Sequence, residues 1–335
     1  MDKTLSTSKE TGPMTGPPGG SKRMALLALL LLLCLLPLVV NDYLQFVANT
    51  MLVYCLVAVG LNVVLGYLGQ LAFANAAFFG IGAYAAGLSM VHFGLSFLWA
   101  TIIGAACGGL AGCLVGLPAL RVRGYYLAII TLAFGELMRW LYVHNDPVTF
   151  GSGGFNMPQI AVFGVPVDEQ GKYYVFLAAV LIGVGATSLL LRSRFGRAFV
   201  AVRNNELAAL SLGINVNRSK VIAFAWSGLI TGLAGALYAA LNGRVSPDTF
   251  GISQMLMHFA IVMIGGLGSM AGSIIGAVLL TGMPELLRNF PGLEEIVFSL
   301  LLIIVLFLMP KGISGFLAGR LPILRERLYR ESKDA

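Results

Sequence analysis

Long apolar segments dominate the chain, and they limit the folds that it can adopt. Ten such segments follow one another along the 335 residues, most of them near the length of about 20 residues that a helix needs to cross a membrane. Only 11% of the residues are charged, against about 25% in soluble domains. We therefore predict an all-α, polytopic membrane helix bundle. The predicted segments are residues 24–40, 45–65, 71–91, 96–118, 124–144, 173–191, 220–242, 252–268, 271–287 and 295–310.

The distribution of Lys and Arg predicts how these segments are oriented. Cytoplasmic loops of membrane proteins carry an excess of both residues. If the N-terminus is cytoplasmic and every segment crosses, 18 of the 22 Lys and Arg residues lie inside, three lie outside, and Arg139 lies within a segment. We therefore expect both termini to be cytoplasmic. The net charge of +7 then reflects membrane topology and not nucleic-acid binding.

The apolar segments divide the chain into three predicted regions. Residues 1–23 are rich in Ser, Thr, Gly, Pro and Lys, which predicts a disordered cytoplasmic tail. Residues 24–312 form the predicted transmembrane domain, and residues 24–40 are expected to be a retained span rather than a cleaved signal peptide. Residues 313–335 form a basic cytoplasmic tail. A glycine-rich break leaves two alternatives open for residues 252–287, namely two full spans or a re-entrant pair.

The chain lacks the motifs that would give it a chemistry of its own. Gly171 and Lys172 do not have the spacing of a phosphate-binding loop, and no H-E-x-x-H or G-x-S-x-G motif is present. The four cysteines lie in apolar stretches without metal-binding spacing. We therefore predict no enzymatic activity, no cofactor and no metal. Any ATP hydrolysis is expected to take place in partner subunits.

Few polar side chains fall within the predicted spans, where each one is costly. Asn62 and Asn75 either hydrogen-bond to neighbouring helices or line a substrate path. Glu136 and Arg139 are spaced i, i+3 on one helix face, so they can form an ion pair, and Glu136 is also a candidate for the path. His258 is expected to be a buried hydrogen-bonding group, because a proton relay would need further acids nearby.

Glycine motifs predict where helices pack closely. Gly-x-x-x-Gly occurs at residues 108–112 and at residues 228–232. Residues 66–69 and 265–268 resemble each other and fall at predicted inner turns. In a chain with 42 glycines, chance explains this likeness better than a duplicated half.

The longest predicted cytoplasmic loop (residues 192–220, the basic loop) has more structure than topology requires. It carries six basic residues and a single acid, Glu206. Asn204 and Asn205 can cap a helix whose first turn holds Glu206, and Gly213 can end it. Such a short helix either docks in a groove of another protein or packs onto its own protein. Both alternatives stay open.

Four stretches of the sequence carry a family resemblance that covers about residues 45–312. They are GLNVVLGYLGQLAFANAAFFGIGAYAA, RVRGYYLAIITLAFGELMR, GRAFVAVRNNELAALSLGINVNRSKVIAFAWSGLITGLAGALYA and IVMIGGLGSMAGSIIGAVLLTGMPELL. They resemble the permease subunits of branched-chain amino-acid ATP-binding-cassette importers, the LivM type. The resemblance implies a multi-pass protein of the bacterial inner membrane. It also implies three kinds of partner, namely a second permease of the LivH type, two cytoplasmic ATPase subunits and a periplasmic substrate-binding protein.

Alternatives to this function stay open. Permeases of the same family carry urea, amides or other amino acids, and nothing in the predicted spans separates these substrates. An ion-coupled secondary transporter is a less favoured alternative, because it would need intramembrane carboxylates or broken helices that bind the ion.

The family resemblance implies that the basic loop is the element that couples to the ATPase. The residues that it assigns to this coupling loop are Arg203, Glu206, Ala208, Ala209 and Gly213. The chain departs from the general importer pattern Glu-Ala-Ala-x-x-x-Gly. Counted back from the glycine, the Glu position is occupied by Leu207, and the acid lies one residue earlier.

Overall fold

The computed structural model describes residues 31–38, 40–122, 124–162, 165–287, 300, 312–313 and 315. The chain separates into two compact units, Met1–Asn41 and Asp42–Ala335. Residues 31–38 of the first unit are helical, within the predicted segment 24–40. The predicted segment 295–310, except for residue 300, and the predicted tail 1–23 lie outside the described residues.

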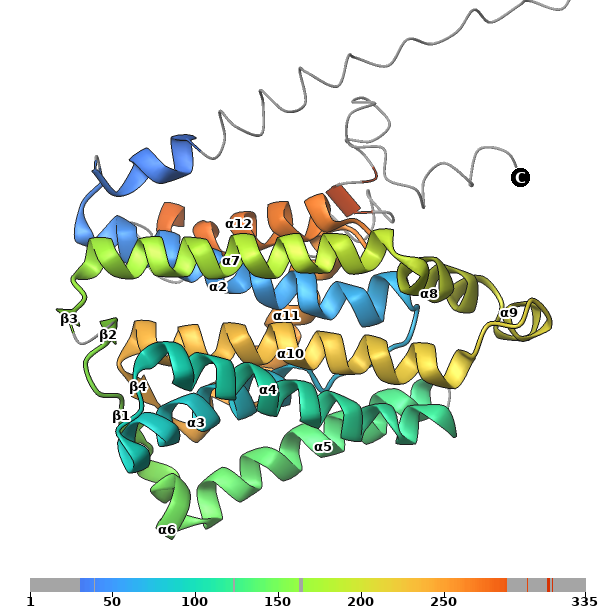
Figure 1. The fold of residues 1–335 in the computed structure, drawn as a ribbon, viewed down its shortest axis with the longest axis horizontal. Coiled ribbons are helices and arrows are strands. Elements are labelled where there is room, and N and C mark those ends of the chain that lie inside the picture. The colour runs from blue at the N-terminus through green and yellow to red at the C-terminus, as the bar shows by residue number, and fades with distance from the viewer. Residues whose placement is uncertain are drawn as a thin grey trace, which may run out of the picture. The chain divides into compact units, whose positions relative to one another are not determined.

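The described part of the second unit is built from helices (Figure 1). Six of them are long and apolar enough to cross a membrane. Each of the six matches a predicted segment, although α3 begins four residues later than expected. The six are α2 (Asp42–Asn62), which continues as the π-helix η1 (Val63–Tyr67), α3 (Asn75–Phe93), α4 (Phe97–Gly116), α5 (Tyr125–His144), α7 (Glu169–Arg192) and α10 (Val216–Asn242).

Residues 252–287 form two further apolar helices, α11 (Ile252–Gly265) and α12 (Met270–Leu287). At about 1.5 Å per residue, the 14 residues of α11 reach about 21 Å, which is less than the hydrocarbon core of about 30 Å. The turn between the two helices lies against the end of α2, through Asn62. Helix α11 is short for a full span, whereas the 18 residues of α12 reach about 27 Å, so helix length supports a different alternative for each half of the pair.

Short elements complete the second unit. Two pairs of antiparallel two-residue strands lie at one end of the bundle, opposite α9 (Figure 1). The pairs are β1 (Phe155–Asn156) with β4 (Arg244–Val245) and β2 (Ala161–Val162) with β3 (Val165–Pro166). The short helical turns are η2 (Pro118–Leu120), α6 (Asp146–Thr149), η3 (Gly151–Gly153) and η4 (Pro247–Phe250).

Segments that are predicted to lie on the same side of the membrane contact one another. The Lys220 ammonium lies 3.5 Å from the Ala119 carbonyl oxygen, which joins two predicted inner regions. Arg244 donates a hydrogen bond of 2.9 Å to the Gly153 carbonyl, which joins two predicted outer regions. These two contacts agree with the sides predicted for the four regions that they join. Which end faces the cytoplasm stays a prediction.

The glycine motifs bring α4 and α10 into close contact. A Cβ atom on Gly228 would overlap the carbonyl oxygen of Gly108 and would lie 3.1 Å from the Cα atom of Gly112. Burial of apolar surface does not drive helix association inside lipid, so close backbone approach carries much of the packing energy. The predicted packing role of both motifs is confirmed.

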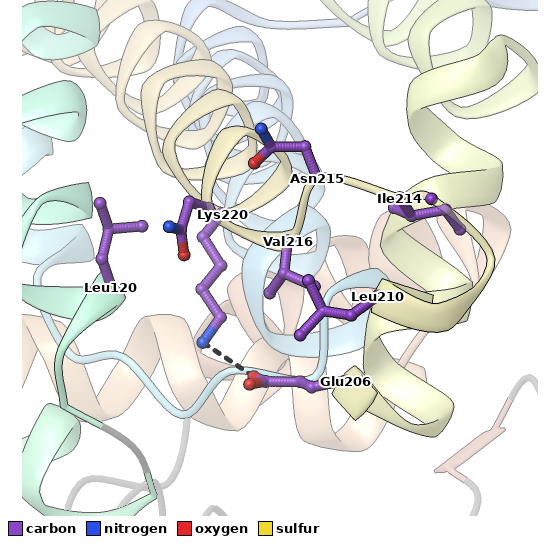
Figure 2. A pocket seen from close by; sticks show the side chains of 9 residues that line it. Leu120, Glu206, Leu210, Ile214, Asn215, Val216 and Lys220 are labelled. Carbon is purple, nitrogen blue, oxygen red and sulfur yellow. Dashed lines mark ion pairs between the residues drawn. The ribbon is translucent and has the colours of Figure 1, made fainter. Parts of the chain in front are cut away.

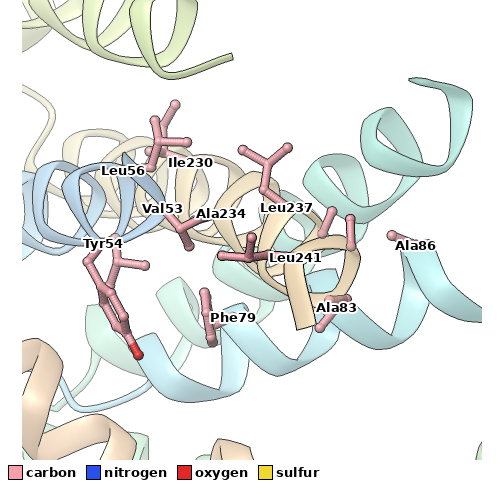
Figure 3. Packing of buried hydrophobic residues seen from close by; sticks show 14 of the residues in the cluster. Val53, Tyr54, Leu56, Phe79, Ala83, Ala86, Ile230, Ala234, Leu237 and Leu241 are labelled. Atoms are coloured by element: carbon pink, nitrogen blue, oxygen red, sulfur yellow. The ribbon is translucent and has the colours of Figure 1, made fainter. Parts of the chain in front are cut away.

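A buried apolar cluster fills the space between α2, α3 and α10 (Figure 3). Val53 and Leu56 of α2, Phe79 of α3 and Leu237 of α10 are wholly removed from the surface. Helix α10 lies at the centre of the bundle, and α2, α3 and α4 pack around it. A displacement at the start of α10 would therefore reach three other spans.

Candidate functional site

The basic loop is folded rather than irregular, and it adds a helix that the sequence analysis did not predict. Helix α8 (Arg194–Asn204) precedes α9 (Glu206–Ser211), and both lie at one end of the bundle (Figure 1). Helix α8 buries Phe199 and Val202 and exposes Arg194 and Arg197. The apolar residues at this spacing form one helix face, which packs on the bundle. The charged loop is thus an amphipathic element held against its own protein.

Helix α9 is capped at its N-terminus by a side chain. The Asn205 side-chain oxygen accepts hydrogen bonds from the backbone N–H groups of Leu207, at 2.9 Å, and of Ala208, at 3.1 Å. These bonds satisfy donors that have no partner within the helix. The predicted cap is confirmed for Asn205, whereas Asn204 ends α8.

A glycine closes the C-terminus of α9. Gly213 has a φ of +78°, a conformation that costs little for glycine only. Its N–H donates to the Leu210 carbonyl at 2.9 Å, and the N–H of Ile214 donates to the Ala209 carbonyl at 3.0 Å. This pair of bonds is a Schellman closure, as the sequence predicted for Gly213. Both ends of α9 are therefore fixed.

The two sides of α9 differ in exposure. Ala209 is 1% exposed and belongs to the same buried cluster as Phe199. By contrast, the side chains of Leu207, Leu210 and Leu212 are 68%, 51% and 79% exposed. Three exposed leucines on one short element are unusual for a surface that faces only water. Helix α9 thus packs onto its own protein through Ala209 and leaves Leu207 and Leu210, together with Leu212 at its C-cap, exposed.

Glu206 turns toward the bundle and forms an ion pair (Figure 2). Its Oε1 lies 2.8 Å from the Nζ of Lys220 in α10, and the two side chains are 16% and 1% exposed. The Nε2 of Gln70 also lies within 3.4 Å of this carboxylate oxygen. An open pocket of 480 Å³ lies beside the ion pair. Its lining residues are Leu120, Glu206, Leu210, Gly213, Ile214, Asn215, Val216, Asn217 and Lys220.

Arg203 also faces its own protein. Its guanidinium donates a hydrogen bond to the Gly66 carbonyl in η1, and its side chain lies against Gly69. Among the residues predicted for the coupling loop, Arg203, Glu206 and Ala209 thus contact the bundle. Ala208 and Gly213 are exposed.

Asn62 is fully engaged by protein groups. Its Nδ2 donates to the Ser269 carbonyl at 2.9 Å and to the Ser273 hydroxyl at 2.6 Å, and its Oδ1 accepts from the Gly268 N–H at 2.8 Å. The contacts bring the similar glycine-rich stretches 66–69 and 265–268 side by side, since a Cβ atom on Gly66 would overlap the Gly268 N–H. They favour the helix-packing alternative for Asn62.

Replacing Asn62 with Leu is expected to destabilise the protein by about 2 kcal/mol or more, because it leaves the buried Gly268 N–H without its acceptor. Thermal unfolding in detergent, followed by tryptophan fluorescence, measures this effect. Asn242, which is exposed at the end of α10, is the control position for the same Asn→Leu change. Equal losses of stability in the two variants would contradict the role given to Asn62.

Asn75 belongs to a second buried polar network. Its Oδ1 accepts a hydrogen bond from Thr231 of α10 at 2.8 Å, and its Nδ2 lies 3.2 Å from the Nδ1 of His258 in α11. The other ring nitrogen of His258 lies 3.0 Å from the Gln254 amide, which also contacts the Tyr54 hydroxyl at 2.8 Å. His258 is wholly buried, so the expectation of a buried hydrogen-bonding histidine is confirmed.

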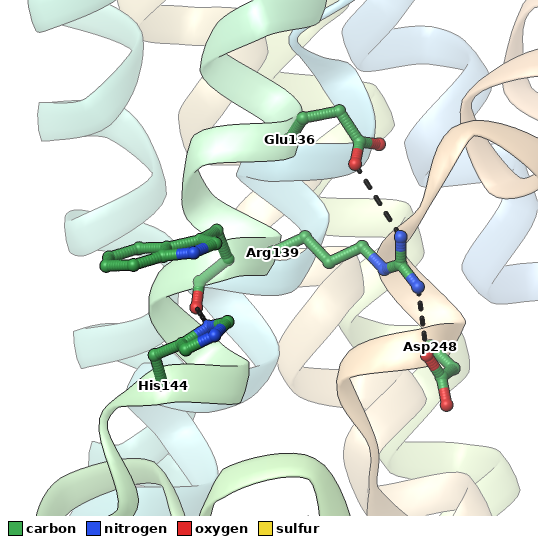
Figure 4. Close-up of polar contacts among 5 residues, drawn as sticks. Glu136, Arg139, His144 and Asp248 are labelled. Carbon is green, nitrogen blue, oxygen red and sulfur yellow. Dashed lines mark hydrogen bonds and ion pairs between the residues drawn. The ribbon is translucent and has the colours of Figure 1, made fainter.

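Glu136 and Arg139 are paired as predicted, and a third charge joins them (Figure 4). Arg139 lies 3.6 Å from Glu136 and 3.1 Å from Asp248 in η4. Sequence reasoning missed Asp248, because no local pattern links positions 109 residues apart. The Glu136 and Arg139 side chains are 38% and 40% exposed on α5, which is the least buried of the six long helices. Charges are costly against lipid, so this face of α5 favours contact with water or with another protein.

The described side chains contain no cluster of His, Cys, Asp and Glu that could hold a metal ion. The arrangement around α9 fixes both ends of a short helix and leaves part of it exposed, and among the described residues it brings together no nucleophile and base.

Comparison with known proteins identifies the kind of chain that carries this site. The family model described as "Branched-chain amino acid transport system / permease component" matches residues 43–309. The chain is 32% identical to the high-affinity branched-chain amino acid transport system permease protein LivM of Escherichia coli (strain K12). That match covers 97% of this chain and 81% of the relative.

Two further relatives are also transport permeases. LivM of Salmonella typhimurium (strain LT2) is also 32% identical, over 94% of this chain and 78% of its own length. The ribose import permease protein RbsC of Haemophilus influenzae is 29% identical over 53% of this chain and 56% of its own length. No solved structure matches the chain. The family match and the near-complete alignments show that the chain belongs to the family of permease components of branched-chain amino-acid transport systems.

Proposed function

We propose that this chain is the permease subunit of an ATP-binding-cassette importer that moves branched-chain amino acids across the bacterial inner membrane. One observation carries the proposal. A doubly capped helix, α9, exposes three leucines at the end of the bundle where the predicted inner loops gather. The sequence has no phosphate-binding loop, which fits ATP hydrolysis in a separate subunit.

The proposed topology places α9 in the cytoplasm. It keeps the ten predicted segments and both cytoplasmic termini, and it follows from the excess of Lys and Arg in the inner regions. The proposed partners are a second permease of the LivH type, two ATPase subunits that receive α9, and a periplasmic substrate-binding protein. The half-exposed charges on α5 support a second membrane subunit or an aqueous path beside this helix.

The proposed mechanism is alternating access driven through α9. Closure of the ATPase subunits moves α9, and the caps make this helix move as one body. Its buried side passes the motion to α10, which packs on α2, α3 and α4. Glu136 stays a candidate for the substrate path because its side chain is 38% exposed on α5, and Asn75 because its amide belongs to a polar network between α3, α10 and α11.

Reconstitution of both permeases in proteoliposomes together with the substrate-binding protein, with and without the two ATPase subunits, tests the proposal. Uptake of labelled leucine is expected only with the ATPase subunits and ATP, and it should persist when proton and sodium gradients are collapsed. Uptake without ATPase subunits, or loss of uptake on collapse of the gradients, would support an ion-coupled transporter instead. Competition by unlabelled isoleucine, valine, urea and ribose identifies the substrate class, and competition by urea or ribose alone would contradict an amino-acid substrate.

A further inference from the structure

The acid of the basic loop is held inside the protein. Glu206 is the first residue of α9, and its carboxylate lies 2.8 Å from the ammonium of Lys220, in the second turn of α10. Lys220 is 1% exposed. A buried ammonium without a counter-ion is strongly unfavourable, so Lys220 requires this carboxylate. The Ala119 carbonyl, at 3.5 Å, provides only a weak additional acceptor.

Glu206 connects three separate parts of the chain. It begins α9, it pairs with Lys220 in α10, and it accepts a hydrogen bond from Gln70 in the segment between η1 and α3. Next to it, Arg203 of α8 bonds to the Gly66 carbonyl in η1. A force applied to α9 therefore reaches α2 and α10 through charged contacts as well as through packing.

The position of Glu206 in the sequence explains why its side chain lies on the inward side of α9. Successive residues of a helix differ by about 100° around the axis. Leu207, which occupies the Glu position of the general importer pattern, is 68% exposed. Glu206, one residue earlier, is 16% exposed and faces Lys220. The shift of one residue thus moves the acid from the outward side of α9 to its inward side.

We propose that Glu206 is a positioning residue for energy coupling, which locks α9 to α10 through Lys220 and does not itself contact the ATPase subunit. The proposal rests on the proposed importer function. It separates two tasks within α9, because the exposed leucines contact the partner while Glu206 and Lys220 keep the helix fixed to the span that it drives.

Hydrogen exchange in the purified permease tests the lock without any partner. The Glu206→Gln variant keeps the shape of the side chain and removes its charge. Exchange of the backbone amides of residues 207–213 is expected to become about tenfold faster, because α9 loses its charged anchor. Glu169→Gln is the matched control, since Glu169 pairs with Lys172 at 2.6 Å but is 44% exposed. Unchanged exchange in residues 207–213 of Glu206→Gln would overturn the lock.

Transport by the complete complex tests whether the Glu206–Lys220 ion pair contributes to energy coupling. With Glu206→Gln, the affinity of the permeases for the ATPase subunits is expected to change less than about twofold, while substrate imported per ATP hydrolysed falls about tenfold. A contact residue would behave differently and would lose ATPase affinity. That result, or wild-type coupling in Glu206→Gln, would overturn the assignment.

A double-mutant cycle tests whether the two residues act as one unit. Lys220→Met alone should lower coupling as Glu206→Gln does, and the double variant should be no worse than either single variant. Additive losses would contradict a shared role. If Glu206→Gln does not fold, Glu206→Asp keeps the charge and shortens the reach, and it should give a smaller loss in both assays.

The outcomes separate this inference from the importer function. Absence of ATP-dependent uptake in the wild-type complex would contradict the importer function, whereas the exchange result on the permease alone decides whether the lock exists. If exchange in Glu206→Gln is fast but the substrate imported per ATP hydrolysed is unchanged, Glu206 anchors α9 without contributing to coupling. That result would overturn the proposed role of Glu206.

Discussion

Replacing Leu207 with Asp is expected to lower ATP-driven uptake at least about 30-fold, through loss of ATPase binding. Leu207 is 68% exposed on α9, so the change removes no buried contact of the permease itself. A well-packed side chain at the centre of a protein interface typically contributes about 2 kcal/mol or more, which corresponds to about 30-fold in affinity. A carboxylate buried without a partner in the same interface adds a further desolvation cost.

The measurement for this variant is uptake in proteoliposomes, together with co-purification of the ATPase subunits. Asn204→Asp is the control, because it places the same charge at an exposed position at the end of α8, outside α9. We expect the control to transport at nearly the wild-type rate. If Leu207→Asp keeps its ATPase subunits, α9 does not dock through this residue.

Replacing Gly228 with Val is expected to destabilise the bundle by about 3 kcal/mol or more. The added side chain would overlap the backbone of Gly108, and backbone atoms cannot move aside as a flexible side chain does. Helices α4 and α10 would separate, and the packing energy gained from their close approach would be lost. Folded protein recovered in detergent, and its thermal unfolding midpoint, measure the effect.

Gly185→Val is the matched control for the change at Gly228. Gly185 lies within α7, and no atom lies within 4 Å of the position that its Cβ would take. This variant makes the same Gly→Val change within a helix but without a clash, and valine is not a worse helix former than glycine, so it should cost less than about 1 kcal/mol. Equal destabilisation of the two variants would show that the α4–α10 contact does not account for the loss.

Features set by local pattern were predictable from the sequence. The apolar segments predicted the six long helices, and the glycine motifs predicted the contact between α4 and α10. Asn205 and Gly213 predicted the two ends of α9, because capping depends on residues within one turn of the helix end. Helix α8 was missed because its charged residues resemble a loop, although Phe199 and Val202 give it one buried face.

Features that depend on distant contacts were not predictable. The partners of Asn62 lie more than 200 residues away, and only the turn between α11 and α12 brings them close. The sequence showed that Glu206 was displaced from the general importer pattern, but not that it faces Lys220. That direction depends on how α9 turns back onto α10 after Gly213. The ion pair between Asp248 and Arg139 was likewise not predictable, because only the folded bundle brings the two residues together.

The central claim is that separate ATPase subunits act on this permease through the exposed side of α9. Photo-crosslinking from single cysteines tests it most directly, in a chain whose four native cysteines are replaced by alanine. A benzophenone label on Leu207→Cys or Leu210→Cys is predicted to capture the ATPase subunit, whereas a label on Ala209→Cys, which is buried, is not. Capture from position 209 as strong as from 207, or no capture of the ATPase subunit from position 207, would contradict the account.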